Sequence, residues 1–229
     1  MQALFQDLKT RSFTAMITKK LFVVVMLMAI AAHFSLYGQR KYYPLEKYWG
    51  ITGGITQSMM QFAPSVKQNL LTGYHSGIAF RYINIKNLGF QAELNLNQRG
   101  WLENGGVFSR RLDYGELALL SHINFGNRFR FFVNIGPTIS YLINQQIVIP
   151  APPSSTLYQH KSEISNPFEY GLAAGFGFYL RFHKQLLQAE ARAYYGANAV
   201  YDTKPADAFD YANNINARIT VAWFIKTSE

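Results

Sequence analysis

Apolar and polar residues alternate along most of the chain beyond residue 39. In the segment FQAELNLNQRGW the even positions from Phe90 to Leu96 are apolar, and the odd positions from Gln91 to Asn97 are polar. A period of two residues indicates a β-strand with two chemically different faces, whereas no window keeps a helical period of 3.6 residues for long. The pattern therefore predicts a protein that is nearly all strand.

The alternating segments predict eight strands, over residues 48–57, 73–83, 88–99, 111–124, 128–142, 167–182, 186–201 and 211–225. The clearest alternation lies in the fifth segment, yet it carries Pro137 on its apolar face. Because proline has no N–H to donate to a neighbouring strand, we expect a bulge or a local irregularity there.

The connections between these strands alternate in length. Residues 84–87, 125–128 and 183–185 form short turns, whereas residues 58–72, 100–110, 143–166 and 202–210 form long loops. Short turns at one end and long loops at the other are typical of bacterial outer-membrane barrels. We predict an all-β fold, an eight-stranded antiparallel up-and-down transmembrane β-barrel over residues 48–226, with both termini in the periplasm.

Composition favours this barrel over a soluble β-sandwich. Charged residues make up 15% of the chain and aromatic residues 16%. A soluble domain carries about 25% charged residues, and the outer faces of a sandwich would need them. Aromatic side chains suit strands and bilayer interfaces. The absence of cysteine excludes disulfides, thiolate metal sites and cysteine nucleophiles.

The N-terminus predicts export. Lys19 and Lys20 precede the apolar run 21–32, which is too short to span a membrane as a helix. We interpret residues 1–38 as a signal peptide, with Met16 as an alternative start, and residues 39–47 as a short periplasmic segment. The predicted location is the outer membrane of a Gram-negative bacterium. The predicted partners are its lipid and lipopolysaccharide, together with proteins of a secretion or assembly complex. Nucleic acid is not expected, because the net charge of +9 is mild and no basic run lies outside the leader.

If the apolar face meets lipid, the polar face fills the barrel. The charged residues placed inside are Arg81, Glu93, Arg99, Glu116, Arg130, Glu169, Arg181, Glu190, Arg192 and Arg218. The interior of an eight-stranded barrel is filled by side chains, and buried charges there must be paired. We interpret the set as a structural plug of ion pairs; a narrow channel or ligand cavity is the alternative. The two glycines Gly175 and Gly177 are expected roughly opposite the pair Glu190 and Arg192, leaving room for these longer side chains.

The loops offer few candidates for catalytic groups. His75 with Ser76, and the aspartates 202, 207 and 210, are the candidates, but their spacing supports no triad. No H-x-x-x-H or H-E-x-x-H pair is present for a metal. The prediction is no catalytic residue, no metal and no cofactor, with a loop-borne lipid or peptide enzyme as the third alternative.

Several stretches resemble the PorT-like outer-membrane β-barrel family, over about residues 49–225. The most specific are Glu93-Leu94-Asn95 with Gln98-Arg99-Gly100, and the segment DYGELALLSHINFG at 113–126. Ala118 stands where family members often have proline, and Gly115 where they have a bulkier residue. The resemblance implies a small exported eight-stranded outer-membrane barrel without catalytic residues. The founding member is associated with the type IX secretion apparatus, but fold alone does not fix function. From the four long loops on a filled barrel we expect a scaffold, a surface-binding protein or an accessory subunit of a secretion or assembly machine.

Overall fold

The computed structural model describes residues 44–63, 65–155, 160, 164–201 and 211–227. The predicted signal peptide at 1–38 and most of the segment 39–47 lie outside the described residues. Among the residues described, no helix is long and apolar enough to cross a membrane.

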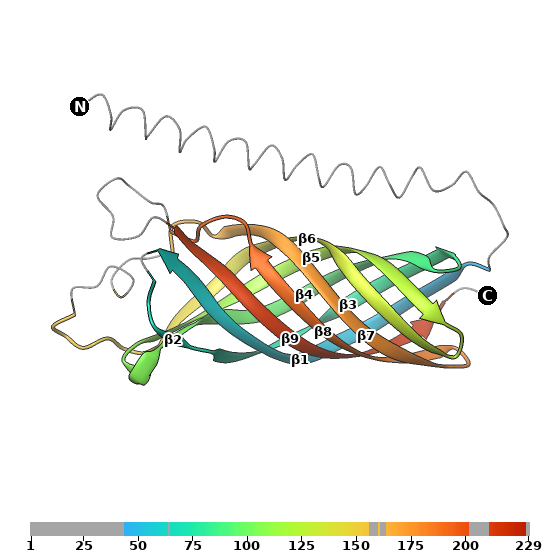
Figure 1. Cartoon of the computed structure of the whole chain (residues 1–229), viewed down its shortest axis with the longest axis horizontal. Coiled ribbons are helices and arrows are strands. Elements are labelled where there is room, and N and C mark those ends of the chain that lie inside the picture. The colour runs from blue at the N-terminus through green and yellow to red at the C-terminus, as the bar shows by residue number, and fades with distance from the viewer. Residues whose placement is uncertain (1–43, 64, 156–159, 161–163, 202–210, 228–229) are drawn as a thin grey trace, which may run out of the picture. The chain divides into compact units, whose positions relative to one another are not determined.

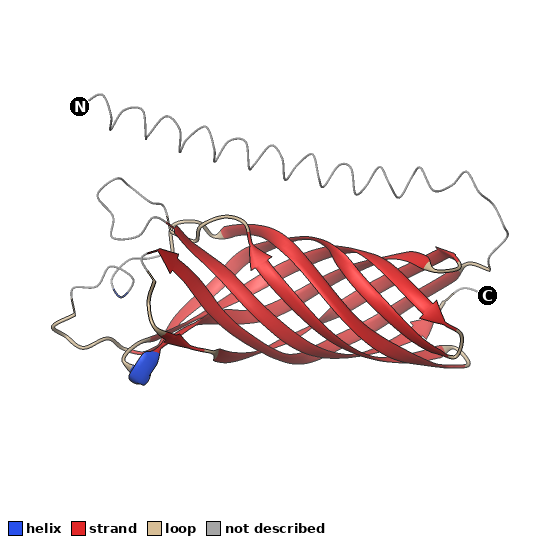
Figure 2. Ribbon diagram, in the orientation of Figure 1, coloured by secondary structure: helices blue, strands red, loops and turns tan. Residues whose placement is uncertain are grey.

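Eight long strands form a closed barrel (Figures 1 and 2). They are β1 (Glu46–Ala63), β3 (Leu71–Ile85), β4 (Leu88–Glu103), β5 (Ser109–Gly126), β6 (Phe129–Ile149), β7 (Phe168–Phe182), β8 (Gln185–Gly196) and β9 (Tyr211–Lys226). Each pairs antiparallel with its neighbours in chain order, and β1 pairs with β9 to close the sheet. The two-residue strand β2 (Gln68–Asn69) extends the sheet beside β4, and a short 3₁₀ helix, η2 (Asn104–Gly106), follows β4. The predicted eight-stranded antiparallel fold is confirmed.

The two ends of the barrel differ. Two-residue turns at 86–87, 127–128 and 183–184 lie at the end where β1 begins and β9 finishes, which we call the hairpin end. The longer connections lie at the opposite end, the loop end (Figure 1). Gly126 opens one of the tight turns with φ of 113°, and a Cβ there would lie 2.3 Å from the Phe129 carbonyl oxygen. Glycine is required at that turn because no other residue fits this approach.

Three strand ends lie five residues or more from their predicted positions. β1 continues to residue 63 and β6 to residue 149. The prediction ended both strands earlier because the apolar–polar alternation stops before the strands do. β8 ends at Gly196 rather than at residue 201. Beyond it the Asn198 side chain accepts a hydrogen bond from the Tyr170 N–H at 2.9 Å and donates one to the Phe168 carbonyl at 2.8 Å. Local side-chain bonds of this kind compete with a strand ladder.

Pro137 causes no bulge. The register of β6 is the same on both sides of it, against β5 as well as β7. The pairing with β7 runs through Pro137 opposite Leu172, while the pairing with β5 omits Leu119 and Leu120. The missing N–H therefore interrupts the ladder on the β5 side and leaves the geometry of the strand unchanged.

The apolar face points outward. Leu94 is 57% exposed and Phe176 69% exposed, whereas Gln91 and Asn95, on the other face of β4, are buried. Phe131 and Ile135, on the apolar face of β6, are exposed as well. These outward apolar side chains form a belt around the barrel, which we call the apolar belt. A continuous exposed apolar surface of this kind does not stay dispersed in water, so it is the surface of a barrel that lies in lipid.

The polar interior as candidate functional site

Nine of the ten charged residues predicted inside the barrel are buried there. At most 5% of the surface of each is exposed: Arg81, Glu93, Arg99, Glu116, Arg130, Glu169, Glu190, Arg192 and Arg218. The tenth, Arg181, lies at the hairpin end with 35% of its side chain exposed. Alternate residues of a strand point to the same face, and these residues all lie on the inner faces of their strands. Their side chains therefore point toward one another inside the barrel.

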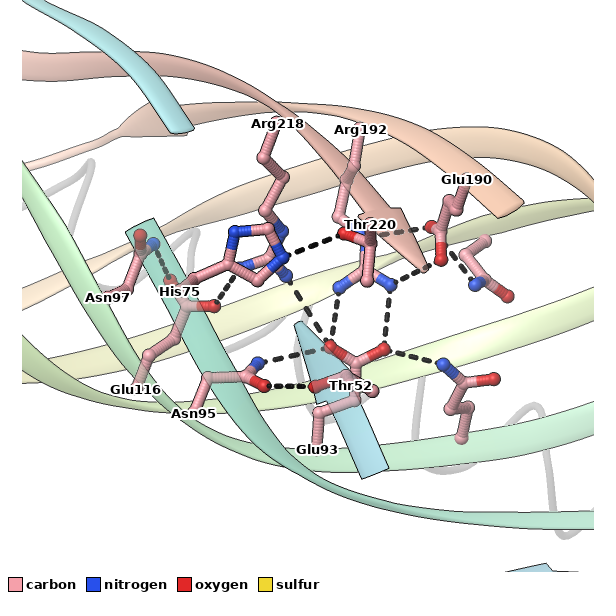
Figure 3. Close-up of polar contacts among 12 residues, drawn as sticks. Thr52, His75, Glu93, Asn95, Asn97, Glu116, Glu190, Arg192, Arg218 and Thr220 are labelled. Atoms are coloured by element: carbon pink, nitrogen blue, oxygen red, sulfur yellow. Dashed lines mark hydrogen bonds and ion pairs between the residues drawn. The ribbon is translucent and has the colours of Figure 1, made fainter. Parts of the chain in front are cut away.

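Glu93 and Arg192 form the centre of the network (Figure 3). Arg192 donates to both oxygens of Glu93, from Nη2 at 2.6 Å and Nη1 at 2.8 Å. The same guanidinium donates to Glu190 on its own strand, from Nε and Nη2, each at 2.8 Å. Arg218 on β9 reaches Glu93 at 3.4 Å and Glu116 at 2.8 Å. Bidentate arginine–carboxylate contacts are the strong form of ion pair.

The glycines of β7 make room for this centre. Gly175 lies opposite Arg192, and Gly177 lies opposite Glu190, as predicted. A Cβ at Gly175 would lie 2.5 Å from Oε1 of Glu190, and one at Gly177 would lie 2.2 Å from the Ala189 carbonyl oxygen. Small residues on β7 are therefore needed by the long side chains of β8.

Arg99 holds the network together toward the loop end. It donates to Glu116 and, at 2.8 Å, to Glu169 on β7. Its guanidinium stacks 4.3 Å from the centroid of the Tyr194 ring, and the Tyr194 hydroxyl in turn donates to Glu169. Asn214 on β9 also donates to Glu169. These contacts join several strands around one guanidinium.

Arg81 is joined to the network through Gln91 and Gln188, which lie on the predicted inward faces of their strands but were not among the ten charged residues singled out there. It donates to the side-chain oxygens of Gln91 and Gln188. The amide groups of these two glutamines donate to Glu93 and, at 3.0 Å, to Glu190. The guanidinium also lies 4.4 Å from the Phe224 ring, 5.2 Å from that of Tyr179 and 5.7 Å from that of Phe132. The alternation of their strands places both glutamines on the inner face. Because neither carries a charge, the sequence does not distinguish them as links in the network.

Glu46 completes the column at the hairpin end. It accepts from Nη1 and Nη2 of Arg130, both at 3.2 Å, and from Arg181 at 2.8 Å. The Tyr48 hydroxyl donates to it at 3.0 Å. Glu46 lay in the predicted periplasmic segment 39–47, whereas the structure makes it the first residue of β1. Its alternation with Tyr48 and Thr52 was the signal for this placement.

The buried charges of this column balance. Five arginines, Arg81, Arg99, Arg130, Arg192 and Arg218, face five glutamates, Glu46, Glu93, Glu116, Glu169 and Glu190. Glutamines, asparagines and tyrosines fill the remaining positions. Charges taken out of water are tolerated when they are paired and hydrogen-bonded. Four of the five arginines contact a glutamate directly, whereas Arg81 reaches Glu93 and Glu190 only through Gln91 and Gln188.

The His75–Ser76 pair does not form a catalytic unit. His75 is buried in the column, where its ring contacts Thr56 Oγ1 at 3.2 Å and Thr220 Oγ1 at 2.9 Å. Ser76 is exposed on the opposite face of β3. Consecutive residues of a strand point to opposite faces, so the two side chains cannot meet. The aspartates 202, 207 and 210 lie outside the described residues.

A second layer closes the barrel at the loop end. It is an apolar cluster that was not predicted from the sequence: Met60, Phe62, Trp101, Phe108, Leu112, Tyr114, Val200, Tyr201 and Ala212. Its members come from several strands and from the connection that follows β8. It shares Tyr114 with the polar column, because the Tyr114 ring lies 5.0 Å from the Arg99 guanidinium and its hydroxyl accepts from Asn214 at 3.3 Å. We call this set the apolar cap.

A polar chain ties the loop between β6 and β7 to the cap. The ring of His160 lies 4.4 Å from that of Phe108, and its Nε2 is 3.0 Å from both oxygens of Glu103. Its Nδ1 is 2.6 Å from the Ser155 hydroxyl. Arg110 lies 5.5 Å from the Trp101 ring and donates to the His160 carbonyl at 3.4 Å.

Comparisons with known proteins place the chain among membrane barrels. Residues 39–202 match the family described as outer membrane protein beta-barrel domain. No curated protein matches the sequence. Among solved structures, Neisserial surface protein A is 11% identical, with a TM-score of 0.47 over 79% of this chain and 96% of that chain. Ail, the attachment invasion locus protein of Yersinia pestis, solved with the heparin analogue sucrose octasulfate, is 14% identical, with a TM-score of 0.42 over 79% and 99%. The N-terminal barrel of Pseudomonas aeruginosa OprF is 11% identical, with a TM-score of 0.37 over 78% and 97%.

Proposed function

The chain belongs to the family of outer membrane protein β-barrel domains, and on that premise we propose that its barrel is a closed plug that acts through its outer rim. The rim would serve as a scaffold, as a surface-binding site or as an accessory subunit of a secretion or assembly machine. The outer leaflet, with its lipid and lipopolysaccharide, would surround the apolar belt. In such barrels the loop end faces outward and the hairpin end faces the periplasm.

The observation that carries this proposal is the continuous column of paired charges. Successive contacts link Glu46 and Arg130 at the hairpin end, the Glu93–Arg192 centre and the Arg99–Glu169 pair. Beyond it the apolar cap adds a layer that disfavours ions, because its polar groups are few and the hydroxyls of Tyr114 and Tyr201 already accept hydrogen bonds from Asn214 and Arg110. A side-chain-filled interior leaves the rim as the surface through which the protein acts.

Planar-bilayer recording tests the plug. The purified barrel should insert without producing discrete currents, while a porin added to the same bilayer shows that the membrane reports conductance. Regular single-channel steps from the wild-type protein would overturn the plug and favour the alternative, a small channel or ligand carrier that uses the polar interior.

The machine we propose is of the PorT-like kind, with type IX secretion as its most specific form. This rests on the resemblance over about residues 49–225, which is most specific in β4 and β5, and it is supported by a filled barrel that leaves only its rim for contacts. Affinity purification from native membranes in mild detergent tests it. Co-purifying components of a secretion complex are expected; recovery of the barrel alone would count against a role as a subunit.

Ester hydrolysis at the outer rim is the second candidate, because one observation favours it. Ser155, His160 and Glu103 form a hydrogen-bonded chain of nucleophile, base and acid, with contacts of 2.6 and 3.0 Å. Against it, the Ser155 N–H already donates to the Pro152 carbonyl at 2.9 Å and so is not free to stabilise an oxyanion. Labelling of the folded barrel by a fluorophosphonate, with the label lost in Ser155→Ala, would establish the hydrolase. If the barrel is not labelled, the hydrogen bonds among Ser155, His160 and Glu103 serve only to hold the loop in place.

A further inference from the structure

Strand β6 rises beyond its neighbour β7 at the loop end. The ladder between them finishes with Tyr141 opposite Phe168, and the last backbone bond runs from the Leu142 N–H to the Pro167 carbonyl at 2.7 Å. On its other side, β6 stays paired with β5 as far as Ile149 opposite Ser109. Among the described residues, no strand pairs with residues 143–149 on the β7 side. We call these seven residues the free edge.

The chain itself turns away from the place that a longer β7 would occupy. The Asn166 N–H donates to the Val200 carbonyl at 3.1 Å, and its side chain donates to the Ala199 carbonyl at 3.1 Å. Ile164 packs against the apolar cap. These contacts draw the approach to β7 toward the connection after β8, and none of the described residues there pairs with β6 beyond Leu142.

The free edge is exposed on both faces of the strand. Every residue from 143 to 148 is exposed, with Ile143 at 61%, Ile147 at 50% and Val148 at 42%. Two register shifts, opposite Asp113/Tyr114 and Ser109/Arg110, each insert an extra residue into β6. Such shifts increase the local twist of the β5–β6 ribbon.

The composition of the free edge is the opposite of a protected edge. Its sequence, INQQIVI, has no charge and no proline and is rich in β-branched residues. Exposed edges are normally protected by lysine, proline, an inward charge or a β-bulge, because unpaired N–H and C=O groups recruit further strands. Of these devices the free edge carries only the two register shifts, which lie in its pairing with β5. We propose that residues 143–149 form a docking site where an extended strand of a protein outside the cell adds to the sheet beside β6. This deepens the proposed surface-binding role and rests on it.

Continuity with the β6–β7 ladder identifies the occupant as an incoming strand. The strand would continue the pairing that stops at Phe168, with main-chain hydrogen bonds for affinity and with Ile143 and Val148 as apolar contacts for alternate side chains. A recognition site built on main-chain groups is tolerant of sequence, and the absence of charge on the edge favours a strand that is itself uncharged along the contact.

A second copy of this chain does not fit the edge. Barrels in one membrane share their orientation, and strands tilt by about 35–45° from the membrane normal, so the β6 edges of two copies facing each other would cross at about 70–90°. Strand pairing requires them to be nearly antiparallel or parallel. A polypeptide arriving from outside the cell has no such constraint.

Peptide selection on the barrel in lipid nanodiscs tests this docking site. The probe is a phage library of eight-residue peptides, selected on the wild-type protein and then measured individually as synthetic peptides. The edge variant carries Ile143→Lys and Val148→Lys. The matched control carries Leu70→Lys and Val107→Lys, two apolar residues of the loop end that are 57% and 44% exposed and lie off the free edge. Heat-modifiable migration on a gel shows that each variant folds.

The expected result is a set of peptides rich in β-branched and aromatic residues that bind the wild type and the control alike. The edge variant should bind them at least about tenfold more weakly, because a lysine on an edge strand opposes pairing. Amides of residues 143–149 should gain protection from hydrogen exchange when peptide is added. Failure to enrich any peptide, or equal binding to the edge variant, would overturn the inference. A wild-type dimer that the edge variant makes monomeric would overturn it in favour of a second copy. None of these outcomes bears on the absence of conductance, which tests the plug separately.

Discussion

Glu93→Gln is the sharpest test of the polar column, because it removes one charge at the centre and keeps the shape of the side chain. The carboxylate accepts bonds from Arg192 at 2.6 and 2.8 Å, from Arg218 at 3.4 Å and from Asn95 at 3.1 Å. The amide that replaces it keeps one acceptor oxygen and turns an NH₂ group toward a guanidinium. Two buried cations thus lose part of their neutralisation.

The expected cost follows from which partners remain. Removing one member of a buried ion pair costs about 3–5 kcal/mol. Arg192 keeps its two contacts with Glu190, and Arg218 keeps Glu116 at 2.8 Å. The loss should therefore lie at the lower end, with the free energy of unfolding reduced by about 3 kcal/mol. The variant should remain silent in planar bilayers, because the side chain still fills its place.

Equilibrium unfolding in guanidinium chloride, with the barrel in lipid vesicles and tryptophan fluorescence as the signal, measures this cost. The double variant Glu93→Gln with Arg192→Gln should lose less than the sum of the two single variants, because the two residues contact each other. The control is Asp113→Asn, which removes a carboxylate from the outer face of β5, where it accepts from the exposed Asn144 at 3.0 Å; this change should cost less than about 1 kcal/mol. Wild-type stability for Glu93→Gln, or strict additivity in the double variant, would refute the paired column.

Three further predictions address the rest of the barrel. The folded protein should migrate faster on a gel before heating than after it, and a chain that is monodisperse in water without detergent would contradict the lipid-facing belt. Gly177→Val should lower the free energy of unfolding by about 2 kcal/mol or more, toward the upper range for overpacking, because its Cβ would lie 2.7 Å from Phe132 Cζ. The control Gly53→Ala should be nearly neutral, because the nearest atom to its Cβ is 3.7 Å away. Equal effects of the two changes would argue against the steric role of the β7 glycines. Phe176→Arg, in the middle of β7, should cost about 2–4 kcal/mol in vesicles, and Tyr141→Arg nearer the loop end about 0–1; the reverse order would misplace the membrane.

The strands and their facing could be predicted because two periodic signals agree. Alternation determines which residues share a face, and the spacing of turns and loops determines which face meets lipid. Nine of the ten charged residues of the column follow from that inversion, because each lies on the inward face of its strand. The tenth, Glu46, does not, since it lay in the predicted periplasmic segment 39–47. For the same reason the hairpin between β7 and β8 is enough to place Gly175 and Gly177 opposite Arg192 and Glu190.

What could not be predicted depends on contacts between distant parts of the chain. Gln91 and Gln188 act as links between Arg81 and two carboxylates, and nothing in either local segment distinguishes them from other inward polar residues. The length of β6 is another case, since residues beyond 142 lose clear alternation and are held extended only by β5. The apolar cap likewise brings together residues from several strands and one loop.

The cap and the column would oppose the passage of solutes through the barrel for different reasons, because the column is lined by paired charges and the cap mainly by apolar side chains. An ion that entered from the hairpin end would meet arginines and glutamates that are already paired, and displacing one pair would leave a buried charge without a partner. It would then meet Trp101, Phe108 and Leu112, which offer no ligand. A solute arriving from the loop end meets the same two barriers in reverse, after the tie between His160 and Glu103. If the barrel is the closed plug proposed above, its function is carried by the rim, where β6 stays paired with β5 beyond the end of its ladder with β7.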